Sequence, residues 1–379
     1  MQKENKENIK FSIITVCLNS VRTIEQSILS VLEQTYKNIE YIIVDGQSVD
    51  GTLDIIKKYK EQIAVCVSEP DGGLYDAMNK GIRMATGDIV GILNSDDRYD
   101  IRTVEKVAQL FQEEHVDVVY GDEMLIYENG YTQRRVTGAL EEITYRMNIS
   151  HPTVFVKRSI YEKYGSFDTR YKIAADYDFL LRIYNQGVVM RECSGILAYF
   201  RMDGFSAQNG ILCADEARNV ALRHLKEEKR EQYVPLIEEE HVHRIRRFQG
   251  QANMREALEN TDIECCKAYL SEVYGKERKK YIIGAGIIGR EVYEFALGLG
   301  IEITGFLDNN ENKSGTEYLG KVVYKPLEIK DKNPLIIVAV LYGQEKIKSQ
   351  LCSEGYEEGR HFIQYMDFVN DIKKCTLKV

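Results

Sequence analysis

The sequence lacks Cys-x-x-Cys pairs, long apolar runs and an excess of positive charge. Its eight cysteines stand mostly among apolar residues, as Cys17 and Cys66 do, which is typical of reduced, buried thiols in a cytoplasmic protein. No run approaches the roughly 18 apolar residues of a transmembrane helix, so any membrane contact should be peripheral. A net charge of −9 argues against a nucleic-acid-binding protein. The polar start of the chain predicts no signal peptide and a flexible tail over residues 1–10.

The sequence does have enough apolar residues for sizeable cores. A length of 379 residues, of which 44% are hydrophobic, predicts a soluble protein of two or three domains. We expect an α/β domain over residues 11–210 and a second α/β domain over residues 276–379. Between them, residues 211–275 are rich in Glu, Lys, Arg and Leu and should form a helical connector.

The most informative local feature is the pair Asp96 and Asp97, which follows an apolar run over residues 88–93. Such a run is typical of a buried strand, and open α/β sheets bind ligands at the carboxyl ends of their strands. Two adjacent carboxylates repel each other unless a cation binds them. Hard oxygen ligands suit magnesium or manganese, which often bring substrate phosphates with them. From the pair alone, a polar turn that caps the next helix is an equal alternative.

Two further apolar runs end in polar residues in the same way. Residues 11–18 are followed by Asn19, and residues 41–44 are followed by Asp45 and a glycine that allows a tight turn. Helical segments separate the runs, so the pattern predicts parallel strands covered by helices. Taken alone, Asp45 is more typical of a turn or a helix cap than of a ligand contact.

Together these segments resemble the family 2 glycosyltransferases, which have the GT-A fold, and most closely the bacterial members that build cell-surface polysaccharides. Four motifs occur in the family's order and at its spacing, and the likeness covers about residues 8–215. The third contains the distinctive string Tyr-Asp-Ala-Met-Asn-Lys-Gly. The motifs are Thr15 to Asn19, Val44 to Thr52, Asp71 to Gly81 and Leu93 to Asp97.

The resemblance implies a donor site at the carboxyl ends of these strands. Asp45 would hold the base of a nucleotide-sugar, and Thr15 and Asn19 would line the same pocket. Asp96 and Asp97 would bind the metal and the sugar diphosphate. The other donor-side residues implied by the motifs are Asp71, Asn79 and Lys80.

Two observations qualify this assignment of the donor side. The family often has Asp-x-Asp where this chain has Asn94-Ser95-Asp96, and one carboxylate fewer implies a modest metal affinity. For Lys80, a place on a solvated helix face is about as good an explanation as a phosphate contact.

The acceptor side needs a base, because a sugar hydroxyl is a poor nucleophile and a placed carboxylate can take its proton. The resemblance puts the family's catalytic Asp at Asp176, with Ala175 where the family usually has Glu. Asp178 is the second candidate, but residues two apart on a helix point to different faces, so only one should face the donor carbon. His151 is implied on the acceptor side, although a lone His is more often structural. Without the resemblance, Asp176 is best explained as a helix cap.

The last hundred residues hold a separate pattern. Gly284, Gly286 and Gly289 follow an apolar strand, and Asp308 comes 24 residues after the first of them. Glycines that let a phosphate approach and an acid for the ribose make up the dinucleotide fingerprint of Rossmann-like folds. The segment also resembles a nucleotide-binding-like domain of bacterial sugar-modifying acetyltransferases. Bound NAD(P) does not follow from the fold, so structural or regulatory, nucleotide-binding and redox roles all stay open.

The resemblance therefore implies an enzyme, an inverting glycosyltransferase that uses manganese or magnesium. It would move a sugar from a nucleotide-sugar, most simply a UDP-sugar, to a saccharide or lipid-linked acceptor. Two other classes stay open: an NAD(P)-dependent oxidoreductase that works through the second α/β domain, and a catalytically inactive nucleotide-sugar-binding scaffold. A homo-oligomer is compatible with the sequence.

Overall fold

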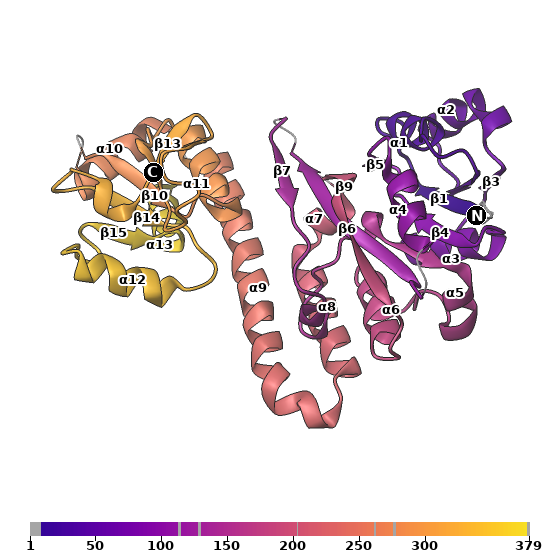
Figure 1. The fold of residues 1–379 in the computed structure, drawn as a ribbon. Coiled ribbons are helices and arrows are strands. Elements are labelled where there is room, and N and C mark those ends of the chain that lie inside the picture. The colour runs from indigo at the N-terminus through magenta and orange to yellow at the C-terminus, as the bar shows by residue number, and fades with distance from the viewer. Residues whose placement is uncertain are drawn as a thin grey trace. The chain divides into compact units, whose positions relative to one another are not determined.

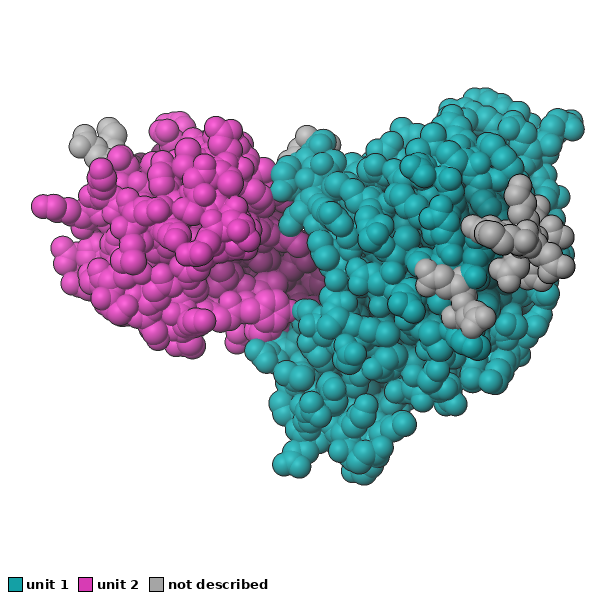
Figure 2. Space-filling model, in the orientation of Figure 1, with its two compact units in different colours: residues 1–241 teal, residues 242–379 magenta. Residues whose placement is uncertain are grey.

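The computed structural model describes residues 9–112, 115–127, 130–202, 204–260, 263–275 and 278–376. It divides into two compact units, residues 1–241 and residues 242–379 (Figures 1 and 2). The division falls inside one helix, α9 (Arg230–Asn260), which lies in the segment predicted as a connector. The three-part domain division therefore stays a prediction.

The predicted flexible tail falls mostly outside the described residues, since its first eight residues are not among them. Lys10, at its end, is held on the first unit. Its backbone N–H donates to the carboxylate of Asp88 at 2.9 Å, and its ammonium group donates to Glu40 at 2.8 Å. The chain is thus bonded to the first unit one residue before the first strand begins.

The first unit is built on one mixed β-sheet with the spatial order β3-β2-β1-β4-β8-β6-β9-β5, and β7 pairs with β6 (Figure 1). The strands β3, β2, β1 and β4 run parallel, whereas β8 is antiparallel to both of its neighbours. The strands are β1 (Phe11–Cys17), β2 (Ile39–Asp45), β3 (Val65–Ser68), β4 (Ile89–Ile92), β5 (Arg98–Tyr99), β6 (Val118–Ile126), β7 (Thr132–Arg135), β8 (Phe155–Lys157) and β9 (Met190–Arg201).

The helices of this unit follow the strands in the order that the sequence predicts for parallel strands with helical crossovers. They are α1 (Ile24–Leu32), α2 (Thr52–Lys58), α3 (Leu74–Met84), α4 (Thr103–Phe111), α5 (Arg158–Tyr164), α6 (Ala175–Tyr184), α7 (Phe205–Gln208) and α8 (Gly210–His224).

The register of three parallel strands decides where the polar motifs lie. β1 is buried along its whole length, as expected for a central strand covered on both faces. Cys17 at its end pairs with Asp45 at the end of β2, and Ile14 pairs with Ile92 at the end of β4. The segments that follow these three strands therefore emerge at one edge of the sheet.

The second unit has its own sheet, in the order β12-β13-β11-β10-β14-β15. All pairs are parallel except β12 with β13, and β13-β11-β10-β14-β15 is the strand order of a doubly wound α/β sheet. The elements are α10 (Ile263–Tyr274), β10 (Lys280–Ile283), α11 (Ile287–Gly298), β11 (Gly305–Leu307), β12 (Glu317–Tyr318), β13 (Lys321–Tyr324), β14 (Leu335–Val338), α12 (Gln344–Ser353), β15 (Phe362–Gln364) and α13 (Tyr365–Thr376).

Two expectations from composition, on membrane-spanning helices and on buried cysteines, can be compared with the structure. Within the described ranges, no helix combines the length and the apolar character needed to cross a membrane. Cys17 is buried, but Cys66 is exposed, which corrects the expectation for that thiol. The reason is its place on the edge strand β3, where alternate residues face outward.

Gly81 offers a test of how tightly α3 packs on the sheet. A Cβ atom added at this position would overlap Cγ2 of Ile14 in β1, so Gly81→Ala should lower the free energy of unfolding by about 1–3 kcal/mol. Chemical denaturation of the full chain measures the change. Gly72→Ala is the control, because its added Cβ would meet only ordinary contacts near 3.6 Å. Equal stability of the two variants would contradict the packing argument.

Candidate functional site

The loop after β2 is ordered by polar side chains that the sequence analysis assigned to a donor pocket. Asp45 is fully buried and accepts hydrogen bonds from the Ser48 N–H at 3.0 Å and from the Ser68 hydroxyl at 2.6 Å. Asn19, with a φ of +51°, donates its N–H to Ser48 and accepts the N–H of Val49 at 3.0 Å. Both residues lie at the predicted edge, and both shape the loop that would meet a ligand.

Asp71 reaches the same edge from the loop before α3. Its carboxylate accepts the N–H of Gly73 at 2.9 Å, and a Cβ on Gly46 would come within 2.6 Å of it. The side chain of Leu18 borders the same glycine and is 56% exposed. Gly46 therefore lies between an exposed apolar side chain and a carboxylate, and a larger residue at this position would collide with Asp71.

Thr15 corrects the predicted pocket lining. It is fully buried inside β1, and its hydroxyl accepts a hydrogen bond from Tyr41 at 3.0 Å. The chain has to run three residues further, past the buried Cys17, before a side chain is exposed. Leu18 and Asn19, not Thr15, are therefore the exposed residues of this motif.

Asn79 and Lys80 both bond to other parts of the protein. The amide of Asn79 forms two hydrogen bonds with the backbone of Phe167, at 2.9 and 3.0 Å. The ammonium of Lys80 donates to the carbonyl of Pro70 at 2.7 Å and pairs with Glu69 at 2.9 Å. These bonds connect α3 to the backbone at Phe167 and to the segment that precedes the helix.

Asp176 lies in the first turn of α6, with its side chain 18% exposed. One carboxylate oxygen is 3.0 Å from the hydroxyl of Tyr75 and accepts the N–H of Tyr177 at 2.9 Å. The other oxygen is 4.0 Å from Nδ1 of His151. Asp176 does not cap its helix, since the N-cap position is Ala174. A carboxylate held in this way at the surface can take a proton from a bound hydroxyl.

Asp178 points to the opposite side, which corrects its place as the second base candidate. Its carboxylate is almost fully buried, is hydrogen-bonded through Oδ1 to Nε2 of His224 at 2.8 Å and lies 4.0 Å from Arg182. The expected divergence of residues 176 and 178 on the helix therefore leaves only Asp176 accessible.

His151 and Asp176 both line a small cavity of about 10 Å³, whose other lining side chains are mostly apolar. Its ring meets Phe167 edge-on, and its Nε2 is buried without a hydrogen-bond partner. Burial lowers the pKa of His151, although Asp176 partly opposes the change, so the imidazole is neutral near pH 7. It borders the candidate base and is not placed to contact a donor.

The two adjacent carboxylates differ in their surroundings. Asp97 is 2% exposed; Oδ1 accepts the N–H of Arg201 at 3.2 Å, and Oδ2 is buried without a hydrogen-bond partner. Asp96 is partly exposed, and a Cβ on Gly204 would come within 2.7 Å of its carboxylate. Arg201, at the end of β9, and Gly204, just before α7, thus lie close to the acidic pair.

Burial raises the pKa of Asp97 well above its usual value, and the neighbouring Asp96 and Glu123 add to the rise. Glu123 is itself fully buried, bonded to the hydroxyl of Ser150 and paired with Arg135. A divalent cation on Asp97 would replace the proton that burial otherwise favours. Within the described ranges there is no cluster of three or more metal-ligating side chains, so water or substrate oxygens would have to complete a coordination shell.

Asp97→Asn tests the cost of burying this carboxylate. Below its raised native pKa but above the usual 3.8, the native protein holds a proton that the unfolded chain has lost, so stability falls as pH rises through this window. The variant should therefore be more stable than wild type at pH 7 in EDTA, by about 1.4 kcal/mol per unit of raised pKa. Thermal unfolding from pH 4 to pH 8 measures the gain, which should fade toward pH 4. A less stable variant at pH 7, or an equal gain in the half-exposed Asp96→Asn, would contradict the prediction.

In the second unit, Gly284 ends β10 with a φ of +110°, and Gly289 packs against its carbonyl oxygen. Gly286 lies between them, in extended backbone just before α11. Asp308 follows β11, but its carboxylate is already engaged. It accepts the N–H groups of Ala285 and Asn310 and pairs with Lys313 at 3.0 Å. The acid predicted to bind a ribose is thus used within the loop, which does not support NAD(P) binding here.

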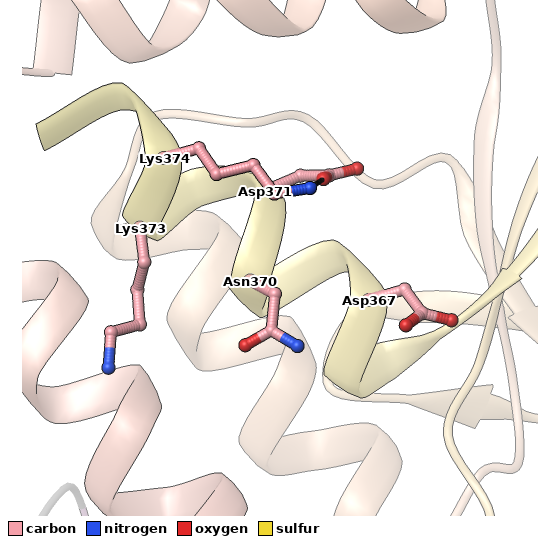
Figure 3. A pocket seen from close by; sticks show the side chains of 5 residues that line it. All are labelled: Asp367, Asn370, Asp371, Lys373 and Lys374. Carbon is pink, nitrogen blue, oxygen red and sulfur yellow. Dashed lines mark hydrogen bonds and ion pairs between the residues drawn. The ribbon is translucent and has the colours of Figure 1, made fainter. Parts of the chain in front are cut away.

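A surface pocket of the second unit lies along α13 (Figure 3). Lys374 and Asp371 form an ion pair at 2.7 Å, while Lys373 points away and pairs with Glu256 at 2.7 Å. Its other lining residues are Asp367 and Asn370. These paired charges give the pocket no group poised for chemistry.

Sequence reasoning missed two residues at the base. Tyr75 stands in the most distinctive motif, so its position was a signal, but its contact partner lies 101 residues away. Glu216 carries no local signal: its carboxylate bonds to the backbone of residues 172–174 only because the fold brings α8 beside that loop.

Comparison with known sequences supplies a first likeness. The family model described as "Glycosyl transferase family 2" matches residues 12–190. The chain is 33% identical over 202 residues to a PGL/p-HBAD biosynthesis glycosyltransferase of Mycobacterium bovis, covering 51% of this chain and 77% of that protein. It is 28% identical over 194 residues to WfaP of Escherichia coli, a UDP-Glc:alpha-D-GlcNAc-diphosphoundecaprenol beta-1,3-glucosyltransferase, covering 50% of this chain and 76% of WfaP.

Among solved structures, residues 1–349 of Staphylococcus aureus TarS in complex with UDP-GlcNAc match with a TM-score of 0.51 and 20% identity. The match covers 62% of this chain and 72% of that chain. A longer TarS structure matches with a TM-score of 0.50 over 43% of its length. These likenesses concern the fold.

Proposed function

Because the chain belongs to glycosyl transferase family 2, we propose that it transfers a sugar with inversion from a UDP-sugar to a hydroxyl of a saccharide or lipid-linked acceptor in cell-surface polysaccharide biosynthesis. The observation that carries the proposal is Asp176, a partly exposed carboxylate held by Tyr75 in the first turn of α6. The UDP-glucose donor and diphosphoundecaprenol-linked acceptor named for WfaP support the choice of substrates.

In this reaction Asp176 takes the proton of the acceptor hydroxyl while that oxygen forms a bond to the anomeric carbon. The bond between the anomeric carbon and the phosphate oxygen breaks, and its electrons leave with UDP. Attack from the face opposite the leaving group inverts the anomeric configuration.

On the donor side, Leu18, Gly46 and Asp71, which come from the segments after β1, after β2 and before α3, would contact the base of the nucleotide. Asp96 and Asp97 would hold a manganese or magnesium ion, and the buried, unpartnered Oδ2 of Asp97 fits such a ligand. When bound, the ion neutralises charge that develops on the leaving diphosphate.

Asp176→Asn tests the base. The amide is similar in shape but cannot accept the proton, so we expect turnover to fall by about 100-fold or more while UDP binding stays unchanged. UDP release measures the first and calorimetry with UDP and manganese the second. Asp215→Asn, which changes a carboxylate on α8 that bonds to His241, should keep most of the turnover. Normal turnover in Asp176→Asn would remove the base from the proposal.

The donor class is tested by thermal shift of the full chain with UDP, GDP, CDP, dTDP and NAD, each with and without manganese. A ligand at about 100 times its Kd adds roughly 2.7 kcal/mol to stability, which is a readable shift. We expect a manganese-dependent shift with UDP. A shift with NAD and with none of the nucleoside diphosphates would instead favour redox chemistry in the second unit.

A further inference from the structure

Glu216 binds the backbone that leads into the helix of the candidate base. Its carboxylate accepts the N–H groups of Lys172 and Ile173, each at 2.9 Å, and of Ala174 at 3.0 Å. Three successive N–H groups that converge on one anion form a strong, charge-assisted arrangement. Asp176 follows two residues after the last of them. The N-cap position of α6 offers no side-chain bond of its own, so the loop depends on this distant carboxylate.

We propose that Glu216 is a positioning residue for the Asp176 base, an inference that rests on the proposed function of Asp176. The loop before α6 is fixed at its start by Asn79, through two hydrogen bonds to Phe167. Glu216 fixes its end. Without it, the chain between Phe167 and α6 has one anchor fewer, and the first turn of the helix can shift.

Tyr75 links a shift of this segment to the carboxylate of Asp176. Its hydroxyl contacts the carbonyl of Ile173, one of the residues held by Glu216, and lies 3.0 Å from Asp176. If Ile173 is displaced, the Tyr75 hydroxyl that it contacts can therefore move relative to the carboxylate of Asp176. A small misplacement of a catalytic group can lower turnover by up to about 100-fold without weakening substrate binding.

The neighbouring residue on α8 provides a matched control. Asp215 is more exposed, and its carboxylate bonds to Nε2 of His241 on α9 at 2.7 Å. None of its recorded bonds goes to residues 172–174. Asp215→Asn therefore removes one charge from the same helix and one contact within the same unit, but it does not change the bonds to residues 172–174.

The experiment compares Glu216→Ala, Glu216→Gln and Asp215→Asn in the full chain. Amide hydrogen exchange over residues 168–180 reports the loop, UDP release from UDP-glucose reports turnover, and calorimetry with UDP and manganese reports donor binding. We expect faster exchange and a kcat about ten-fold lower in Glu216→Ala, with UDP affinity and the donor KM unchanged. Glu216→Gln should be intermediate, because a neutral oxygen accepts weaker bonds, and it also serves if the alanine variant does not fold.

Three outcomes would overturn the inference: faster exchange with normal kcat, which is a purely structural role; loss of UDP affinity in step with kcat; or equal losses in Asp215→Asn. The proposed function fails separately. If wild type releases no UDP from UDP-glucose, UDP-galactose or UDP-GlcNAc with any acceptor tried, the base assignment falls without reference to a variant.

Discussion

A sheet buried on both faces can present polar chemistry only at its edges, and this constraint organises the first unit. The middle of β1 has no room for a ligand, since every residue from Phe11 to Cys17 is buried. Polar groups therefore concentrate where β1, β2 and β4 end, and the aligned register of these strands brings their loops together. The positions of the acidic pair, of the loop after Asp45 and of Gly46 all follow from this one arrangement.

The most distinctive motif of the chain works as scaffolding around Asp176. Gly81 lets α3 pack closely on β1, Asn79 holds the backbone at Phe167, and Tyr75 reaches Asp176. A string that looks like a ligand-binding signature is thus largely occupied with protein contacts. Its residues connect α3 to the segment that precedes α6, the helix on which Asp176 lies.

Much of the fold could be predicted from the sequence, and the GT-A architecture of the first unit is confirmed by the solved structures it resembles. Strand ends were predictable because apolar runs stop where polar residues begin. The orientation of single side chains was not: Thr15 falls on an inward position, and Asn79 bonds to a backbone 88 residues away. The divergence of Asp176 from Asp178 was predictable from helix geometry alone, whereas Glu216 depends on tertiary contact that no local pattern encodes.

The helix α9 has a practical consequence for dissecting the chain. The two units meet in its interior, at residues 241 and 242, and there is no loop at that point. A cut there would leave four carbonyl groups of one fragment and four N–H groups of the other without their helical partners. Separate expression of either unit would therefore do better with a boundary moved to an end of the helix, before Arg230 or after Asn260, even though this transfers a stretch of one unit to the other.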